Sequence, residues 1–150
     1  MKYQSYRDLI KKHEGFSLKV YEDTVGNPSV GWGHAFLYSP KPAVGTVFSD
    51  EQVIEFFEND MHIVEKDYVW LENRFALHHL NYVRRGVLKN MLFNLGLTKL
   101  LGFRKMIKAL QEGKWKQAAS ELLDSKYAKQ VKGRAVELAH LLQTGKMIET

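Results

Sequence analysis

His13-Glu14-Gly15 closes a predicted helix, and the segment from Leu18 to His34 that follows it has a different character. An N-cap residue at Ser5 and apolar residues at helical spacing predict this first helix, with Glu14 in its last turn. Gly15 can take the left-handed conformation that ends a helix. The helix dipole is negative at this end and disfavours a carboxylate there. A carboxyl group whose ionisation is opposed suits a general acid that works near neutral pH.

The segment after Gly15 predicts a β-hairpin. Residues 18–21 are strand-like, residues 23–28 are rich in turn formers, and Ser29 to His34 resumes the strand character. A third short strand is expected before Pro40.

The rest of the chain is predicted to be helical. A capping box at Ser49-Asp50-Glu51-Gln52 opens a long helix. The segment from Asn81 to Leu95 is apolar on most sides, which is typical of a buried central helix. Further helices are expected around Arg104–Gln111, Trp115–Leu123 and Gly133–Gln143. The long helix carries its apolar residues at Val53, Ile54, Phe57, Met61, Val64, Tyr68 and Leu71.

These elements predict an α+β fold in a single domain that spans residues 1–150. A small hairpin lobe at about residues 15–50 is joined to a helical lobe at about residues 75–150 by a linking helix at about residues 50–72. The N-terminal helix is expected to pack with the helical lobe. A cleft between the two lobes is the expected place for a ligand.

Composition and charge narrow the function classes. The chain has no cysteine, so disulfides and thiolate chemistry are excluded. Residues 1–75 carry 8 Lys and Arg against 12 Asp and Glu, whereas residues 76–150 carry 14 against 5. This polarity indicates either an anionic partner for the C-terminal half, such as a cell-wall polymer, a membrane surface or nucleic acid, or only a solubilising surface. The first residues form no apolar leader and no apolar run is long enough to span a bilayer, so we expect no signal peptide and no stable membrane insertion.

Glu14 and Asp23 are a candidate catalytic pair. One carboxylate at a helix end and one at a hairpin turn can flank a glycosidic bond across a cleft. The structural alternative pairs Glu14 with a lysine and places Asp23 in an Asx turn with Thr24 or Val25. The spacing of the two acids does not by itself decide between these interpretations.

The residues around this pair closely resemble the catalytic signature of phage-type lysozymes, glycoside hydrolase family 24. The resemblance covers nearly the whole chain, although the connection between His34 and Ser49 is shorter than in the family. Weaker matches run in family order through the helical half, from Val83-Arg84-Arg85 to Arg134-Ala135. The signature itself consists of Glu14-Gly15, Leu18-Lys19, Tyr21, Asp23-Thr24, Gly26, Val30-Gly31 and Gly33-His34.

The resemblance implies roles for several residues. Glu14 would protonate the leaving oxygen, and Asp23 would activate water or stabilise the transition state, with inversion as the outcome. The family has a threonine to hold that water where this chain has Ser29, which keeps the hydroxyl but loses the β-branch. Phe93 matches a cleft residue, although an aromatic on this helix can equally be core. Arg134 matches the arginine that pairs with the catalytic glutamate, and a solvent or phosphate contact is its alternative.

The histidines and tryptophans are interpreted mainly as structural residues. His34 is expected to end the hairpin, and the family resemblance implies that it pairs with Asp60; general base and metal ligand are its alternatives. His78-His79 has no third ligand at useful spacing, so we expect neither a metal nor another cofactor. The basic stretches lack interleaved aromatic residues, so nucleic-acid binding is not expected. Core positions are expected for Trp32, Trp70 and Trp115.

The resemblance implies the function of an endolysin, a glycoside hydrolase that cleaves the β-1,4 bond between N-acetylmuramic acid and N-acetylglucosamine in peptidoglycan. We expect a monomer that accumulates in the host cytoplasm and reaches the wall when a holin releases it. A non-catalytic wall-binding or protein-binding module is the alternative. A third interpretation, a nucleic-acid-binding module, predicts salt-sensitive DNA binding that does not depend on Glu14.

Overall fold

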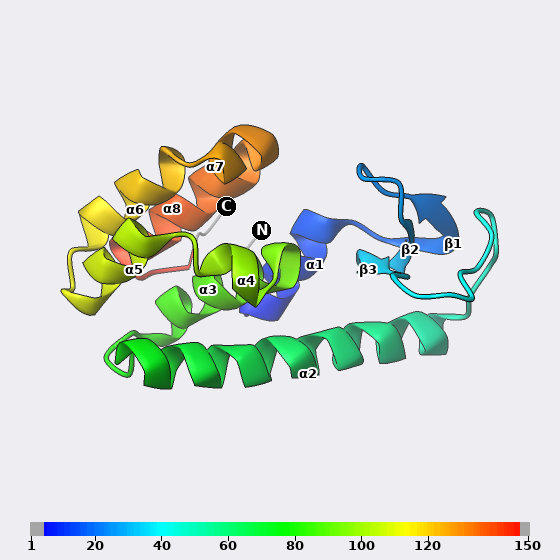
Figure 1. The fold of residues 1–150 in the computed structure, drawn as a ribbon, viewed down its shortest axis with the longest axis horizontal. Coiled ribbons are helices and arrows are strands. Elements are labelled where there is room, and N and C mark those ends of the chain that lie inside the picture. Colours follow the sequence, from blue (N-terminus) through cyan, green and yellow to red (C-terminus); the bar gives the residue numbers. More distant parts are fainter. Residues whose placement is uncertain (1–4, 148–150) are drawn as a thin grey trace. The chain divides into compact units, whose positions relative to one another are not determined.

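The computed structural model describes residues 5–147, which form eight α-helices and three antiparallel strands (Figure 1). The predicted α+β class is confirmed. The chain divides into two compact units, Ile10–Ile63 and Met1–Leu9 with Val64–Thr150. The division falls within α1 (Tyr6–Glu14) and α2 (Asp50–Phe75), so each of these helices contributes to both units. The expectation of no leader rests partly on residues 1–4, which lie outside the described range.

The first helix, α1, begins and ends as its sequence predicts. The hydroxyl of Ser5 accepts a hydrogen bond from the backbone N–H of Asp8 at 3.2 Å, which is the N-cap interaction. Gly15 has a φ of +72°, and its N–H donates to the carbonyl of Lys11 at 3.1 Å. Glu14 therefore occupies the last helical position.

The sheet consists of β1 (Ser17–Glu22), β2 (Pro28–Gly31) and β3 (His34–Ala35), in that order. Figure 1 shows the strands side by side. The strand character predicted from Ser29 to His34 is interrupted, because the chain turns at Trp32 and Gly33, and the third short strand expected before Pro40 is β3. Gly31 and Gly33 have φ values of +65° and +71°, which suit a turn and not a strand. His34 consequently begins a third strand.

Residues 45–48 cover the other edge of β1. The N–H of Val20 donates to the carbonyl of Thr46 at 2.8 Å, and the N–H of Phe48 donates to the carbonyl of Leu18 at 2.9 Å. These bonds satisfy backbone groups that an open edge would expose. The core of this unit is formed by buried Val20, Val30 and Val53, surrounded by partly buried Leu18, Trp32, Phe36, Phe48 and Phe56.

The predicted capping box at the start of α2 is confirmed. Ser49 Oγ accepts from the Gln52 N–H at 3.1 Å, and Gln52 Oε1 accepts from the Ser49 N–H at 2.9 Å. The predicted apolar side is buried except for Ile54, which is 49% exposed. Its prediction as a core residue is wrong because it lies one residue past Val53, to the side of the stripe that continues through Phe57.

The helical unit is built around α3, which is buried along most of its length. Asn81 caps α3 by accepting from the Arg84 N–H at 2.9 Å, and the helix ends at Gly96 as predicted. The C-terminal helix α8 packs against α3, α6 and α7. None of the described helices is both long enough and apolar enough to cross a membrane. The helices of this unit after α2 are α3 (Tyr82–Leu95), α4 (Leu97–Leu100), α5 (Arg104–Gln111), α6 (Trp115–Leu123), α7 (Lys126–Val131) and α8 (Gly133–Thr144).

The tryptophans differ in burial from the prediction. Trp32 is partly buried and meets Phe57 edge-on, with ring centroids 5.4 Å apart. Trp115 is partly buried beneath the guanidinium of Arg84, which lies 3.9 Å from its ring centroid. The core prediction for Trp70 is wrong, because this side chain is 47% exposed.

Candidate active site

The side chain of Glu14 lies against the backbone of Gly33. A Cβ atom placed on Gly33 would lie 2.5 Å from Glu14 Oε1 and 3.2 Å from Glu14 Cδ. Glycine is therefore required here both by this close approach and by the positive φ. The turn between β2 and β3 consequently limits where the Glu14 carboxyl group can lie.

Asp23 follows β1 and uses one carboxylate oxygen to organise the hairpin turn. Its Oδ1 accepts hydrogen bonds from the backbone N–H groups of Val25, at 3.0 Å, and Asn27, at 2.8 Å. The Asx turn that the sequence offered as a structural alternative is thus present. Within residues 5–147 no hydrogen bond or ion pair involves Oδ2 of Asp23. The structural role therefore leaves the second oxygen available for chemistry.

Tyr21 links the two carboxylates electrostatically. Burial raises the pKa of the Tyr21 phenol, and the negative charges of Glu14 and Asp23 raise it further. Both carboxylates therefore act on the same phenol within the unit of residues 10–63. Tyr21 belongs to the catalytic signature, but the sequence assigned no role to it. Its position two residues before Asp23, at the end of β1, was the available signal.

Ser29 lies in the central strand and is 2% exposed. It is paired with Tyr21 on β1 and with Ala35 on β3. Residues directly opposite one another in an antiparallel sheet project to the same face, so Ser29 is the neighbour of Tyr21. Its hydroxyl donates to the carbonyl of Asn27 over 3.4 Å, a long bond, and it retains the capacity to accept a hydrogen bond.

His34 and Asp60 form the contact that the sequence predicted. His34 Nδ1 lies 2.9 Å from Asp60 Oδ2 and 3.1 Å from Oδ1. The imidazole also stacks on Phe56 with a centroid distance of 4.5 Å and meets the ring of Phe36 edge-on. These contacts join β3 to α2 and account for His34 as a structural residue.

Phe93 and Arg134 belong to the other unit, so their relation to Glu14 stays a prediction. Phe93 is a partly buried residue of α3. Arg134 donates from Nε, at 3.0 Å, and from Nη2, at 2.8 Å, to Oδ1 of buried Asn90. This contact fixes the position of the guanidinium relative to α3.

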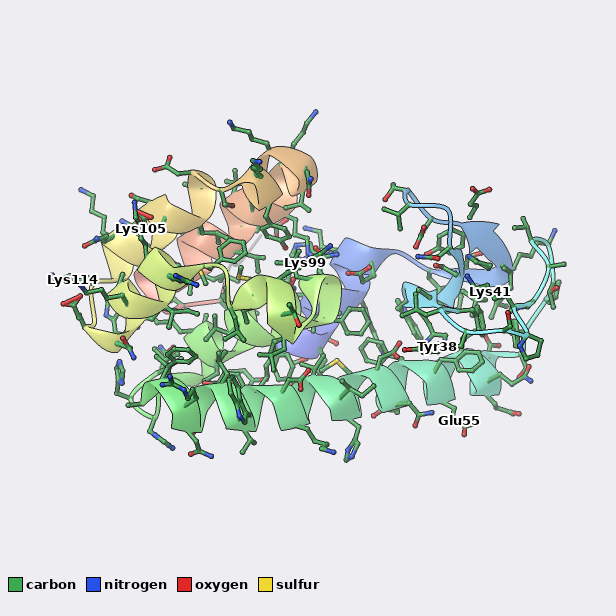
Figure 2. All side chains as sticks on the ribbon, viewed as in Figure 1. Tyr38, Lys41, Glu55, Lys99, Lys105 and Lys114 are labelled. Atoms are coloured by element: carbon green, nitrogen blue, oxygen red, sulfur yellow. The ribbon has the colours of Figure 1, made fainter. Side chains whose placement is uncertain are left out.

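The described residues also show which charged side chains could meet a metal ion or an anionic ligand. Among the described residues, no group of three or more His, Asp or Glu side chains is arranged to hold a metal ion. The basic excess of the C-terminal half is visible at the exposed side chains of Lys99, Lys105 and Lys114 (Figure 2). Arg84, by contrast, is buried and donates to the carbonyls of Leu142 and Gln143, so it supports α8.

Several known proteins are similar to this chain in sequence. Probable T4-type lysozyme 1 of Dictyostelium discoideum is 26% identical over 164 aligned positions, which cover 94% of this chain and 95% of that protein. The endolysin of Acyrthosiphon pisum secondary endosymbiont phage 1 is 27% identical, with coverage of 90% and 86%. The pre-baseplate central spike protein Gp5 of Enterobacteria phage T4 is 27% identical over 95% of this chain, which corresponds to 28% of that protein. The profile of the phage lysozyme family matches residues 11–142, and the chain belongs to this family.

Proposed function

We propose that the chain is a muramidase that hydrolyses the β-1,4 bond between N-acetylmuramic acid and N-acetylglucosamine in bacterial peptidoglycan. Membership of the phage lysozyme family supports a glycosidase of the lysozyme type. The observation that carries the proposal is the placement of the two carboxylates in one unit: Glu14 lies against Gly33 in the turn between β2 and β3, and Asp23 is fixed through Oδ1 by the hairpin turn. Glycosidases use two carboxyl groups in this way.

In the proposed reaction, Glu14 donates its proton to the glycosidic oxygen as the bond to the anomeric carbon breaks. A water molecule attacks that carbon from the opposite face and passes a proton to Asp23. Because Oδ1 of Asp23 is occupied by the turn, Oδ2 is the oxygen assigned to the water. The hydroxyl of Ser29 accepts a hydrogen bond from this water and orients it.

The family mechanism, carried over to Glu14 and Asp23, implies inversion at the anomeric carbon. An inverting glycosidase holds its carboxyl groups roughly 6.5–9.5 Å apart to admit the water, whereas a retaining enzyme needs a separation of about 5 Å. Proton NMR of a short glycan during hydrolysis gives the configuration of the first product. The α-anomer is expected, and initial accumulation of the β-anomer would overturn this part of the mechanism.

The bond specificity is tested on purified sacculi. Fragments released by the protein are reduced with borohydride and identified by mass spectrometry. Reduced N-acetylmuramic acid at the new ends supports the proposal, whereas reduced N-acetylglucosamine would assign the protein to the other glycosidic bond. Release by a holin from the cytoplasm of a host cell stays a prediction.

A non-catalytic wall-binding module is the second candidate. Ser29 in place of the family threonine and the short connection after His34 are the features that favour it. Such a module binds sacculi but releases no fragments, so the same digestion distinguishes the two functions.

A further inference from the structure

A groove on the helical unit lies apart from the residues assigned to hydrolysis. Its volume is about 500 Å³, and all of its lining residues fall within residues 64–150. The groove lies between the C-terminal turns of α2 and one face of α5, and we call it the α2–α5 groove. Its principal lining residues are Trp70, Arg74 and Phe75 of α2 and Arg104, Ile107 and Lys108 of α5.

Each wall of the groove is formed by two side chains that lie one helical turn apart. Trp70 and Arg74 are four residues apart on α2, and Arg104 and Lys108 are four residues apart on α5. Residues at this spacing lie one above the other on the same face of a helix. One indole and three cationic side chains therefore surround the same space.

The base of the groove is apolar and held in place. Ile107 is 3% exposed, and the ring of Phe75 meets that of Trp70 edge-on at 6.4 Å between centroids. The side-chain amide of Gln111 donates to the carbonyl of Phe75 at 2.8 Å, which ties the end of α5 to the end of α2. Trp70 itself remains 47% exposed, so much of its side-chain surface is open to a ligand.

The groove carries positive charges that no carboxylate in its lining balances. No Asp or Glu lines it, and within residues 5–147 no carboxylate lies within ion-pair distance of Arg74, Arg104 or Lys108. The guanidinium of Arg74 instead lies 5.0 Å from the centroid of the Phe75 ring. Neighbouring cations repel one another, and an anionic ligand would relieve that repulsion.

We propose that the α2–α5 groove binds peptide-substituted glycan, with a sugar ring against Trp70 and stem-peptide carboxylates held by Arg74, Arg104 and Lys108. The inference rests on the proposed function, because the wall polymer supplies both groups together. Guanidinium forks match carboxylates in shape as well as in charge. The volume of the groove lies within the range of roughly 300–1,000 Å³ that is usual for ligand pockets. A second point of attachment would raise the effective concentration of polymer near the site of hydrolysis.

The test uses Glu14→Gln protein so that the probe is not digested. A disaccharide-tetrapeptide with free carboxylates is titrated into isotopically labelled protein and followed by NMR, with neutral tetra-N-acetylglucosamine as the comparison. The Trp70 indole N–H and the amides of α5 are expected to shift with the muropeptide and much less with the neutral glycan. Lys108→Glu is expected to weaken the groove affinity about tenfold, the loss typical of one charged hydrogen bond.

Lys105→Glu is the matched control, because Lys105 is exposed on the same helix and does not line the groove (Figure 2). It is expected to leave the affinity within about twofold, since exposed charges outside a contact contribute little. Circular dichroism of both variants checks that the helices are intact. Trp70→Ala gives an independent second test, and it is expected to reduce binding without any change in charge.

Equal losses in Lys105→Glu and Lys108→Glu would overturn the proposal, as would equal shifts with the neutral glycan. Displacement of the muropeptide by an equimolar DNA duplex would overturn it in favour of nucleic acid.

Hydrolysis of sacculi by protein that retains Glu14 is scored separately. Hydrolysis without groove shifts rejects the groove and leaves the proposed function standing. Groove shifts without hydrolysis reject the proposed function and retain the groove as a wall-binding site.

Discussion

Gly33 and Glu14 are in such close contact that the first carbon of any side chain at position 33 would fall 2.5 Å from Glu14 Oε1. The contact joins the turn between β2 and β3 to the last residue of α1. Glu14 and Gly33 both belong to the sequence signature described above. They lie side by side in the fold, although they are far apart in sequence. The turn limits where the carboxyl group of the proposed general acid can lie.

Gly33→Ala should therefore reduce turnover more than it reduces stability. The methyl group displaces the Glu14 carboxyl, and misplacement of a catalytic group by about 1 Å costs on the order of 100-fold in rate. The positive φ adds a backbone cost of about 1–2 kcal/mol. Rates of fragment release from sacculi and urea unfolding of the same samples measure the two effects.

Gly45→Ala is the control for backbone strain alone. Gly45 has a φ of +94°, and a Cβ atom built on it meets nothing within 4 Å. It should lose similar stability and keep its turnover. Parallel losses of turnover in the two variants would contradict the role assigned to Gly33.

Tyr21 should report the charges of both carboxylates. Burial and two neighbouring negative charges raise the pKa of its phenol, so removal of either charge should lower that pKa toward the ordinary value of 10.0. Glu14→Gln and Asp23→Asn are expected to do so. NMR titration of the tyrosine ring carbon in each variant gives the measurement.

Glu22→Gln is the matched control for Tyr21, because Glu22 adjoins it in sequence but does not contribute to its shift. This variant should leave the pKa of Tyr21 unchanged. A fall of the same size in all three variants would mean that Tyr21 senses only overall charge.

Turnover should depend on the hydroxyl group of Ser29 and not on the size of its side chain. Ser29→Ala is expected to lower turnover about tenfold or more, since it removes one polar partner of the reacting water. Ser29→Thr restores the family residue and should keep the activity, although an extra methyl group at a buried position can cost about 1–3 kcal/mol of stability. Activity of Ser29→Ala equal to that of the unmodified protein would remove Ser29 from the mechanism.

Glu65 should contribute a pH-dependent part of the stability. Burial opposes its ionisation, but hydrogen bonds from Tyr6 and Lys89 outweigh burial and lower the pKa of Glu65. A lowered folded-state pKa gives a contribution that is complete above the unfolded value, near 4.5, and is lost as the pH falls through the folded value. The stability difference between the unmodified protein and Glu65→Gln should thus shrink below that pH.

Urea unfolding at neutral pH and at acid pH measures this difference. Glu55→Gln is the control on the same helix, because Glu55 is exposed and makes no hydrogen bond or ion pair within the described residues (Figure 2). If the gap between the unmodified protein and Glu65→Gln stayed constant with pH, the pKa of Glu65 could not be lower in the folded state than in the unfolded one.

Local sequence signals predicted much of the fold. The caps at Ser5, Gly15 and Ser49 act through bonds within a few residues, so sequence alone located them. The helices α4 and α7 were missed because segments of four and six residues are too short to show a full apolar repeat.

Features that depend on tertiary packing could not be predicted from the sequence. The helical pattern could not reveal that Trp70 would face a groove, because its exposure depends on where α5 packs. The role of Tyr21 likewise depends on the approach of Glu14 from another element. The pairing of His34 with Asp60 was predicted through the family resemblance, since nothing local connects residues so far apart.

Fragment release from purified sacculi by the unmodified protein and by Glu14→Gln tests the central claim most directly. Glutamine preserves the shape of the side chain but cannot donate the proton. A general acid contributes about 10²–10⁴-fold to rate, so the proposed mechanism predicts rapid release by the unmodified protein and a loss of that size in the variant. Equal release by the two folded proteins, or none from the unmodified protein, would contradict it.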